Sequence, residues 1–388
     1  MKKGKNSSQR VILVAKLFLL FVVWRAALFG LGFIAPSVLP YQPSFASPTA
    51  LLIYKMPIWI YSWANFDGVH YLTLGRWGYN GAALIQAFFP LLPLLMATLN
   101  YFLQNLLVAG LLITNGAFFI ALVGWFVMTK SLWNQKMAWI ATAVLLLFPT
   151  SFYFVAIYNE SIYLALIIWS WYFVRKRHWI FAGLLGGLAA ATRVVGVLWL
   201  AVLLWEFLQL KPKERRTQLP QLAIALLLTM SGLVAFMLYL NQAFADPLLF
   251  LHVQSQFGAG RSQSLIIYPQ VIWRYLKILA TARPFDLKYF AYTQEFIAGT
   301  IGLVTLVVAW LKKLPKSLVI YSVLAFLLPT LTGTFSSMPR YLLSAPAIIV
   351  LPAVLLAKKP HWLWLYLLFS TILLVVNTIL FIQGYWVA

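Results

Sequence analysis

Apolar runs of about twenty residues, repeated along most of the chain, restrict the fold more than any other feature of the sequence. Residues 11–35 and 106–129 are clear examples. A membrane-spanning α-helix needs about twenty apolar residues, whereas a spanning β-strand alternates its polarity over about ten. With 63% hydrophobic and only 9% charged residues, a soluble domain of this length could not bury its apolar surface. The sequence therefore predicts an all-α, polytopic membrane protein.

Basic residues gather in short segments between the apolar runs, notably at 175–178, 211–216 and 312–316. The positive-inside rule places such segments in the cytoplasm. The first run is too long for a cleaved signal peptide, so we expect an uncleaved span with a cytoplasmic N-terminus. Counting onward predicts about eleven transmembrane spans in a single membrane domain covering 1–388. Residues 179–208 fit this count only as two half-spans that meet near Arg193.

Two large extracytoplasmic loops are expected, at 36–89 and 241–290. The second holds five basic residues against two acidic ones, a surplus that suggests an anionic partner: Arg261, Arg274, Lys277, Arg283 and Lys288 against Asp246 and Asp286. The net charge of +22 is otherwise explained by cytoplasmic loops and anionic headgroups, so nucleic acid is not an expected partner. The chain has no cysteine, and no cluster with metal-ligand spacing, so no metal site is predicted.

The segment 63–95, WANFDGVHYLTLGRWGYNGAALIQAFFPLLPLL, concentrates polar and aromatic residues in an apolar chain. It contains Asp67, His70, Arg76 and Gln86. Because the whole chain has only seven carboxylates, Asp67 is a candidate functional residue. The alternative is an aromatic belt at the membrane interface, in which Asp67 caps a short helix. His70 is expected to share a helical face with Asp67, where it either orients an acceptor or holds the loop by a hydrogen bond.

Three further polar pairs are predicted on the same side of the membrane: Asn159–Glu160, Thr192–Arg193 and Arg340–Tyr341. A carboxylate can accept the proton of a sugar hydroxyl as that hydroxyl attacks. An arginine can hold a phosphate leaving group through two hydrogen bonds and offset its growing charge. Carboxylates and arginines beside an apolar groove therefore suit glycosyl transfer from a lipid-linked phosphate donor.

Four segments resemble, in order, motifs of the PIG-V family, which comprises the second mannosyltransferase of GPI assembly and its bacterial relatives. They lie between residues 63 and 352 and read FDGVHYLTLGRWGY…AFFPLLPLL, FPTSFYFVAIYNESIYLAL, ATRVVGV and SMPRYLLSAPAIIVL. The resemblance implies a GT-C glycosyltransferase that transfers a hexose, typically mannose, with inversion at the extracytoplasmic face of the cell membrane. It implies a polyprenyl-phosphate sugar as donor substrate, an acceptor glycan or lipid, and no cofactor. GPI synthesis itself is not inferred.

The resemblance also implies roles for individual residues. Asp67 matches the acid assigned to catalysis, and we expect it to be the general base, with burial among Trp63, Phe66 and Trp77 raising its basicity. Glu160 matches the acid that follows the FP segment of the family; its structural alternative is an ion pair with Arg193 or Arg25. The chain departs from the family at Asn65–Phe66, where members often have Arg-Trp, and at Asn159, where Thr is usual.

Arginine is the expected ligand of the donor's phosphate, with Arg340 the first candidate and Arg193 the second. The remaining residues predicted to bind substrate or donor are His70, Tyr71, Arg76, Gln86, Asn159 and Tyr341. The main rival to a transferase is a transporter or flippase for lipids or sugars. Such folds usually contain inverted repeats with helices broken at mid-membrane, and no repeat is apparent here. A non-catalytic scaffold is the third alternative, although it would not require carboxylates and arginines from four separate segments.

Overall fold

The computed structural model describes residues 2–43, 48–257, 261–262, 264–284 and 286–387, and every regular element in this part of the chain is helical. Five of its helices are long and apolar enough to cross a membrane. They are α1 (Lys2–Val38), α5 (Leu106–Leu132), α10 (Pro212–Phe244), α13 (Leu287–Leu311) and α17 (Pro360–Ile382). The all-α membrane class is confirmed.

The remaining elements are shorter helices. The α-helices are α2 (Ile58–Tyr61), α3 (Asp67–Trp77), α4 (Leu91–Leu103), α6 (Gln135–Leu146), α7 (Glu160–Arg175), α8 (Trp179–Ala190), α9 (Trp199–Leu208), α11 (Leu249–His252), α12 (Tyr268–Thr281), α14 (Lys316–Thr330), α15 (Met338–Tyr341) and α16 (Pro346–Leu356). The 3-10 helices are η1 (Pro48–Tyr54), η2 (Ser62–Ala64), η3 (Gly78–Asn80), η4 (Ile85–Ala87), η5 (Ser151–Phe154), η6 (Val194–Leu198), η7 (Val253–Phe257) and η8 (Leu342–Ser344).

The expected eleven spans are not confirmed. Residues 338–344 and α16 make a sixth span only if their 82° bend lies within it, and several other apolar helices have just 10–17 residues. At 1.5 Å per residue, such helices are shorter than the hydrocarbon core of about 30 Å. The run at 137–155 shows the cause: α6 ends at Leu146, and the chain turns through Pro149 into η5, because proline cannot continue a helix without losing a hydrogen bond.

The expected break near Arg193 is confirmed, since residues 191–193 separate α8 from η6 and α9. Two ion pairs show that the start of α8 and the end of α9 lie close together. Arg175, at the end of α7, lies 3.7 Å from Glu206 near the end of α9. Arg177 lies 3.0 Å from Glu214 in the first turn of α10. The α8–α9 unit therefore enters and leaves the bundle at the same end, and Arg193 lies at the opposite one.

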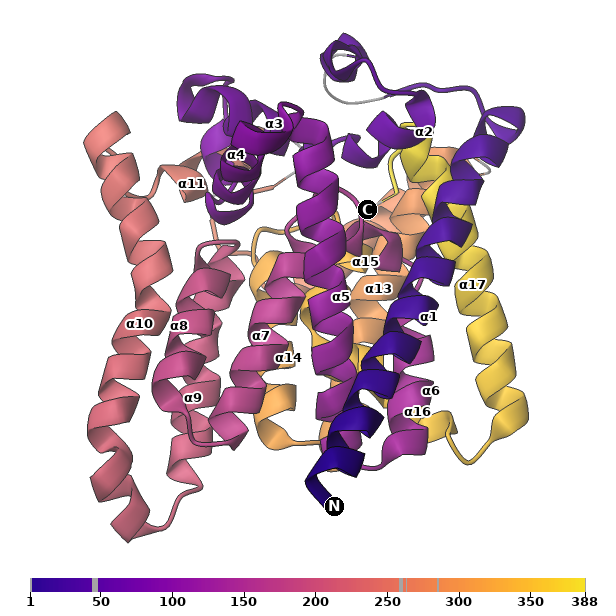
Figure 1. Ribbon diagram of the computed structural model, residues 1–388. Coiled ribbons are helices and arrows are strands. Elements are labelled where there is room, and N and C mark those ends of the chain that lie inside the picture. Colours follow the sequence, from indigo (N-terminus) through magenta and orange to yellow (C-terminus); the bar gives the residue numbers. More distant parts are fainter. Residues whose placement is uncertain (1, 44–47, 258–260, 263, 285, 388) are drawn as a thin grey trace.

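The helical bundle has two chemically different ends (Figure 1). One end carries α2, α3 and α11, which belong to the segments expected as large loops, together with α4, and the other carries the basic turns before α8 and α10. The second large segment is shorter than the expected 241–290, because α10 continues to Phe244 and α13 begins at Leu287. The site described below lies toward the first end.

Membrane orientation can be tested by cysteine labelling, because the chain has no native cysteine. Both His178, in the turn before α8, and Asn80, at the end of η3, are exposed. In intact cells, we expect an impermeant thiol reagent to label Asn80→Cys and to leave His178→Cys unlabelled until the membrane is opened, as the positive-inside rule requires. Labelling of His178→Cys from outside would contradict the proposed orientation.

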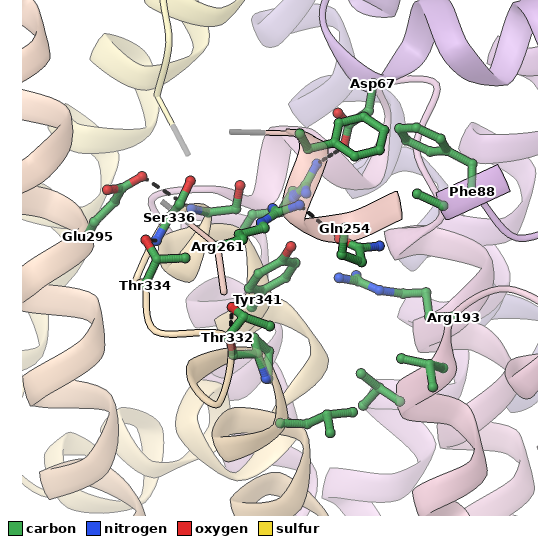
Figure 2. A pocket seen from close by; sticks show the side chains of 18 of the residues that line it. Asp67, Phe88, Arg193, Gln254, Arg261, Glu295, Thr332, Thr334, Ser336 and Tyr341 are labelled. Carbon is green, nitrogen blue, oxygen red and sulfur yellow. Dashed lines mark hydrogen bonds and ion pairs between the residues drawn. The ribbon is translucent and has the colours of Figure 1, made fainter. Parts of the chain in front are cut away.

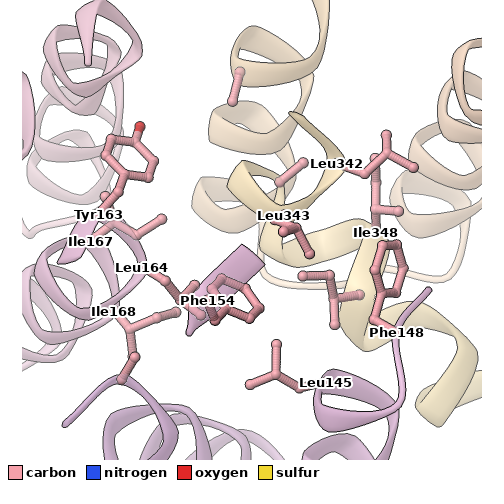
Figure 3. Close-up of a cluster of buried hydrophobic side chains, with 14 of the residues drawn as sticks. Leu145, Phe148, Phe154, Tyr163, Leu164, Ile167, Ile168, Leu342, Leu343 and Ile348 are labelled. Atoms are coloured by element: carbon pink, nitrogen blue, oxygen red, sulfur yellow. The ribbon is translucent and has the colours of Figure 1, made fainter. Parts of the chain in front are cut away.

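A buried apolar cluster lies beneath the site and joins α6, η5, α7, η8 and α16 (Figure 3). Phe154 stacks on Phe118 of α5, with ring centroids 4.7 Å apart, and Leu164, Leu343 and Ile348 pack in the same cluster. Helix association inside a membrane depends on such close packing. The cluster holds the short segments that carry Glu160 and Arg340 at fixed positions relative to each other.

Candidate active site

A cavity of about 680 Å³ lies between the first large segment, the α8–α9 break, α12, α13 and α15. Seven of the ten predicted site residues line it: Asp67, Tyr71, Asn159, Glu160, Arg193, Arg340 and Tyr341. Figure 2 shows side chains from these separate elements pointing toward one another. Members of all four polar segments expected on one side of the membrane therefore lie around one cavity.

Four charged side chains form a continuous chain of ion pairs on the wall of the cavity. The Nη1 of Arg340 lies 2.5 Å from Oδ2 of Asp67, and its Nε lies 3.6 Å from Oε1 of Glu160. The same Oε1 is 3.0 Å from Nη1 of Arg193. Arg340 therefore bridges both carboxylates, and Glu160 bridges both arginines.

The two carboxylates differ in their access to a ligand. The Glu160 side chain is only 3% exposed, whereas that of Asp67 is 23% exposed. Within the described part of the chain, no hydrogen bond to Oδ1 of Asp67 is formed, while Oδ2 accepts from Arg340. Asp67 therefore presents one carboxylate oxygen to the cavity, and Glu160 mainly holds the two arginines.

The pKa of Asp67 is lowered, which contradicts the expected rise in basicity. Burial of the carboxyl raises its pKa, but the charge and hydrogen bond of Arg340, with smaller contributions from His70 and Arg261, shift it below its ordinary value. An opposite charge at hydrogen-bonding distance stabilises the ionised form. Asp67 is therefore ionised throughout the neutral pH range. Its carboxylate is a weaker base than burial alone would make it.

The backbone around Asp67 does not support the alternative of a helix cap. Asp67 is the first residue of α3, and the preceding N-cap position is Phe66 with φ of 58°. The backbone N–H of Asp67 donates to the hydroxyl of Tyr158 (3.2 Å), which itself donates to the carbonyl of Asn65 (3.1 Å). A buried tyrosine therefore holds the start of α3, and the Asp67 carboxylate is left to contact Arg340.

Asn159 and Tyr341 organise the charged groups. The Nδ2 of Asn159 donates to the hydroxyl of Tyr71 (2.8 Å) and to the carbonyl of Thr192 (2.7 Å), and so joins α3, the start of α7 and the α8–α9 break. The ring of Tyr341 lies 5.2 Å from the guanidinium of Arg193 and 5.3 Å from that of Arg340. Cation–π contacts at these distances favour the positive form of both arginines.

Three predicted site residues do not line the cavity. His70 stacks on Phe88 with ring centroids 4.6 Å apart, so it lies behind a side chain that does line it. Arg76 is exposed at the end of α3, 4.7 Å from the ring of Trp77. Gln86 donates to the carbonyl of Tyr79 (3.0 Å). Their proposed contacts with substrate stay predictions, and the contacts of Gln86 are those of a loop-stabilising residue.

Glu295, on α13, is a cavity residue that the sequence reasoning missed. It is buried and accepts hydrogen bonds from the hydroxyl of Tyr275 (2.6 Å), the backbone N–H of Ser337 (3.2 Å) and Nε1 of Trp386 (3.4 Å). It faces the cavity from the side opposite Asp67 (Figure 2). The sequence does contain a signal for Glu295, because a carboxylate inside an apolar run is itself a candidate functional residue.

Comparisons with known proteins add little to this geometry. No family model matches the chain, and no curated protein is similar in sequence, so the resemblance to the PIG-V family stays a prediction. A similar solved structure is the oligosaccharyltransferase of Archaeoglobus fulgidus in complex with zinc and sulfate, with 12% identity and a TM-score of 0.41. The similarity covers 92% of this chain and 53% of the other, so the chain spans about half the length of that protein. The functional proposal therefore rests on the site and on the sequence resemblance, and takes nothing from this similarity.

Proposed function

We propose that this protein is a membrane glycosyltransferase that moves a sugar from a lipid-linked phosphate donor to the hydroxyl of an acceptor. The observation that carries the proposal is Asp67, which lines the cavity, has a partly exposed side chain, and has only Oδ2 held by Arg340 within the described residues. The lining also has an excess of positive charge, with Arg193, Arg261, Arg274, Lys288 and Arg340 against Asp67, Glu160 and Glu295. Such an excess favours an anionic substrate.

The proposed reaction needs one base and one held leaving group. The acceptor oxygen attacks the anomeric carbon, the bond from that carbon to the phosphate oxygen breaks, and its electron pair leaves with the lipid phosphate. The hydroxyl proton passes to Oδ1 of Asp67. Arg340 keeps the Asp67 carboxylate ionised and oriented, and attack opposite the leaving group inverts the anomeric carbon.

The size and lining of the cavity are consistent with such a donor. Pockets for small ligands usually measure about 300–1,000 Å³, and this one measures about 680 Å³. Its wall combines charged groups with Phe250, Phe257 and Ile278, which suit the first part of an isoprenoid tail. From the resemblance to the PIG-V family, we propose a polyprenyl-phosphate hexose, with mannose as the first candidate and the extracytoplasmic face as the side of transfer.

The direct test uses purified protein in a bilayer with polyprenyl phosphate carrying a labelled mannose. We expect release of the lipid phosphate together with transfer of the label to an acceptor extracted from cells that lack the protein. Boiled protein and acceptor-free reactions are the controls. Movement of the intact donor across the bilayer without cleavage of the sugar–phosphate bond would instead support the transporter alternative.

A further inference from the structure

Among the cationic side chains of the cavity, Arg261 and Lys288 have no carboxylate partner in the described part of the chain. Arg261 follows η7, lines the cavity, and donates from Nη1 to the neutral Oε1 of Gln254 (2.9 Å). Lys288, in the first turn of α13, also lines the cavity, and no ion pair of its ammonium group is formed within the described residues. By contrast, Arg193 and Arg340 are both held by carboxylates.

This difference matters because a ligand phosphate must compete with the existing partners of each cation. Taking Arg340 away from the wall would leave Asp67 and Glu160 without their shared counter-charge, and an uncompensated buried carboxylate is strongly unfavourable. Arg261 has only a neutral amide to release. Its positive charge is also close enough to Asp67 to contribute to the lowered pKa of that carboxyl, so it lies near the group that would receive the proton.

The same segment of chain offers apolar contacts for a lipid. Phe250, Leu251 and Phe257, from α11 and η7, line the cavity together with Arg261. In Figure 2 the guanidinium of Arg261 projects into the cavity between Asp67 and Tyr341. A ligand with an anionic head and an apolar tail could therefore contact this one segment along its length.

We propose that Arg261 and Lys288 form the subsite for the donor's phosphate, with Arg261 as the principal ligand. This inference rests on the proposed function and assigns the phosphate to the second large segment instead of to Arg340. The ligand class is a prenyl monophosphate, either free as product or esterified to a sugar as donor. Arg340 and Arg193 then hold the carboxylates, while Arg261 offsets the charge that develops on the leaving phosphate.

The test compares farnesyl phosphate with farnesol, which has the same tail and no phosphate, by binding to purified protein in nanodiscs. Loss of a charge-assisted hydrogen bond should weaken farnesyl phosphate binding about 10–100-fold in Arg261→Gln. Farnesol binding should be unchanged, which also reports that the variant is folded. Lys288→Gln should weaken phosphate binding several-fold and reduce its salt dependence. The matched control is Arg283→Gln, since Arg283 is exposed in the same segment and does not line the cavity.

The subsite is overturned if Arg261→Gln binds farnesyl phosphate within twofold of the parent protein, or if Arg340→Lys loses that binding while Arg261→Gln keeps it. If Arg261→Gln also loses farnesol, the uncharged and flexible Arg261→Met decides: weakened phosphate binding with parental farnesol binding supports the subsite, and parental binding of both ligands overturns it. Failure of the subsite can be distinguished from failure of the proposed function. Phosphate-specific binding without sugar transfer by the parent protein would retain the subsite and reject the transferase.

Discussion

Asp67→Asn is expected to abolish sugar transfer, with a fall in rate of about 10²–10⁴. Asparagine has the size of aspartate and can still hydrogen-bond to Arg340, but it cannot take the proton of the attacking hydroxyl. Because the Asp67 carboxylate does not cap a helix, the substitution should leave α3 in place. The measurement is the initial rate of transfer from labelled donor, with farnesyl phosphate binding as the check on the cavity.

A matched control for this experiment is Asp286→Asn. Asp286 is an exposed carboxylate whose side chain accepts the backbone N–H of Lys288 at the start of α13, and asparagine caps helices as well as aspartate does. It should transfer sugar at the parental rate. If Asp67→Asn turns over within a few-fold of the parent protein, Asp67 is structural, and Glu160 becomes the next carboxylate to test.

Arg340→Gln is expected to produce the largest loss of stability among the site variants, roughly 3–5 kcal/mol in the free energy of unfolding. Arg340 is the ion-pair partner of Asp67 and one of the two partners of Glu160, so its removal leaves an uncompensated carboxylate beside a buried one. Arg340→Lys should not restore stability, because a single ammonium cannot reproduce the separate Nη1 and Nε contacts. Denaturant unfolding in detergent measures the change, with exposed Arg76→Gln as control.

A double variant tests whether the charge itself is responsible. Arg340→Gln combined with Asp67→Asn removes the uncompensated carboxylate, and it should therefore be more stable than Arg340→Gln alone. Equal stability of the single and double variants would show that Arg340 acts through packing and not through its ion pairs.

The pH dependence of stability provides a second readout of the same pair. The pKa of Asp67 is lowered from its ordinary value of 3.8, so its ion pair stabilises the fold above that value and is lost only as pH falls through the lowered pKa. In Arg340→Gln the effect of burial, which raises the pKa, is no longer opposed by the largest charge. The acid limb of the stability curve should therefore move to higher pH.

Parts of the site were predictable because each left a local signal in the sequence. Asp67 stood out because carboxylates are rare in an apolar chain, and the break at Arg193 followed from the basic residues at both ends of 179–208. Tyr71 lines the cavity with Asp67, as expected for positions four apart on one helix face. His70, only one residue earlier, is instead directed at Phe88.

Other parts depend on contacts that no local pattern records. The pairing of Asp67 with Arg340 joins α3 to α15, and this pairing makes the largest contribution against the effect of burial on the carboxyl pKa. The eleven spans expected from the apolar runs are not confirmed, because proline and short 3-10 segments divide runs such as 137–155. Glu295 lies in an apolar run whose composition predicts a plain span, yet it anchors the turn before Arg340 through Ser337.

The order of the four charged residues along the chain has a consequence for biogenesis. Asp67 and Glu160 leave the ribosome before Arg193, and Arg340 emerges last of the four. Until then, the nascent protein carries two acidic side chains destined for the site and only one of their two basic partners. The site therefore cannot be complete until α15 has been synthesised, and the carboxylates must remain hydrated, protonated or otherwise shielded while translation continues to that point.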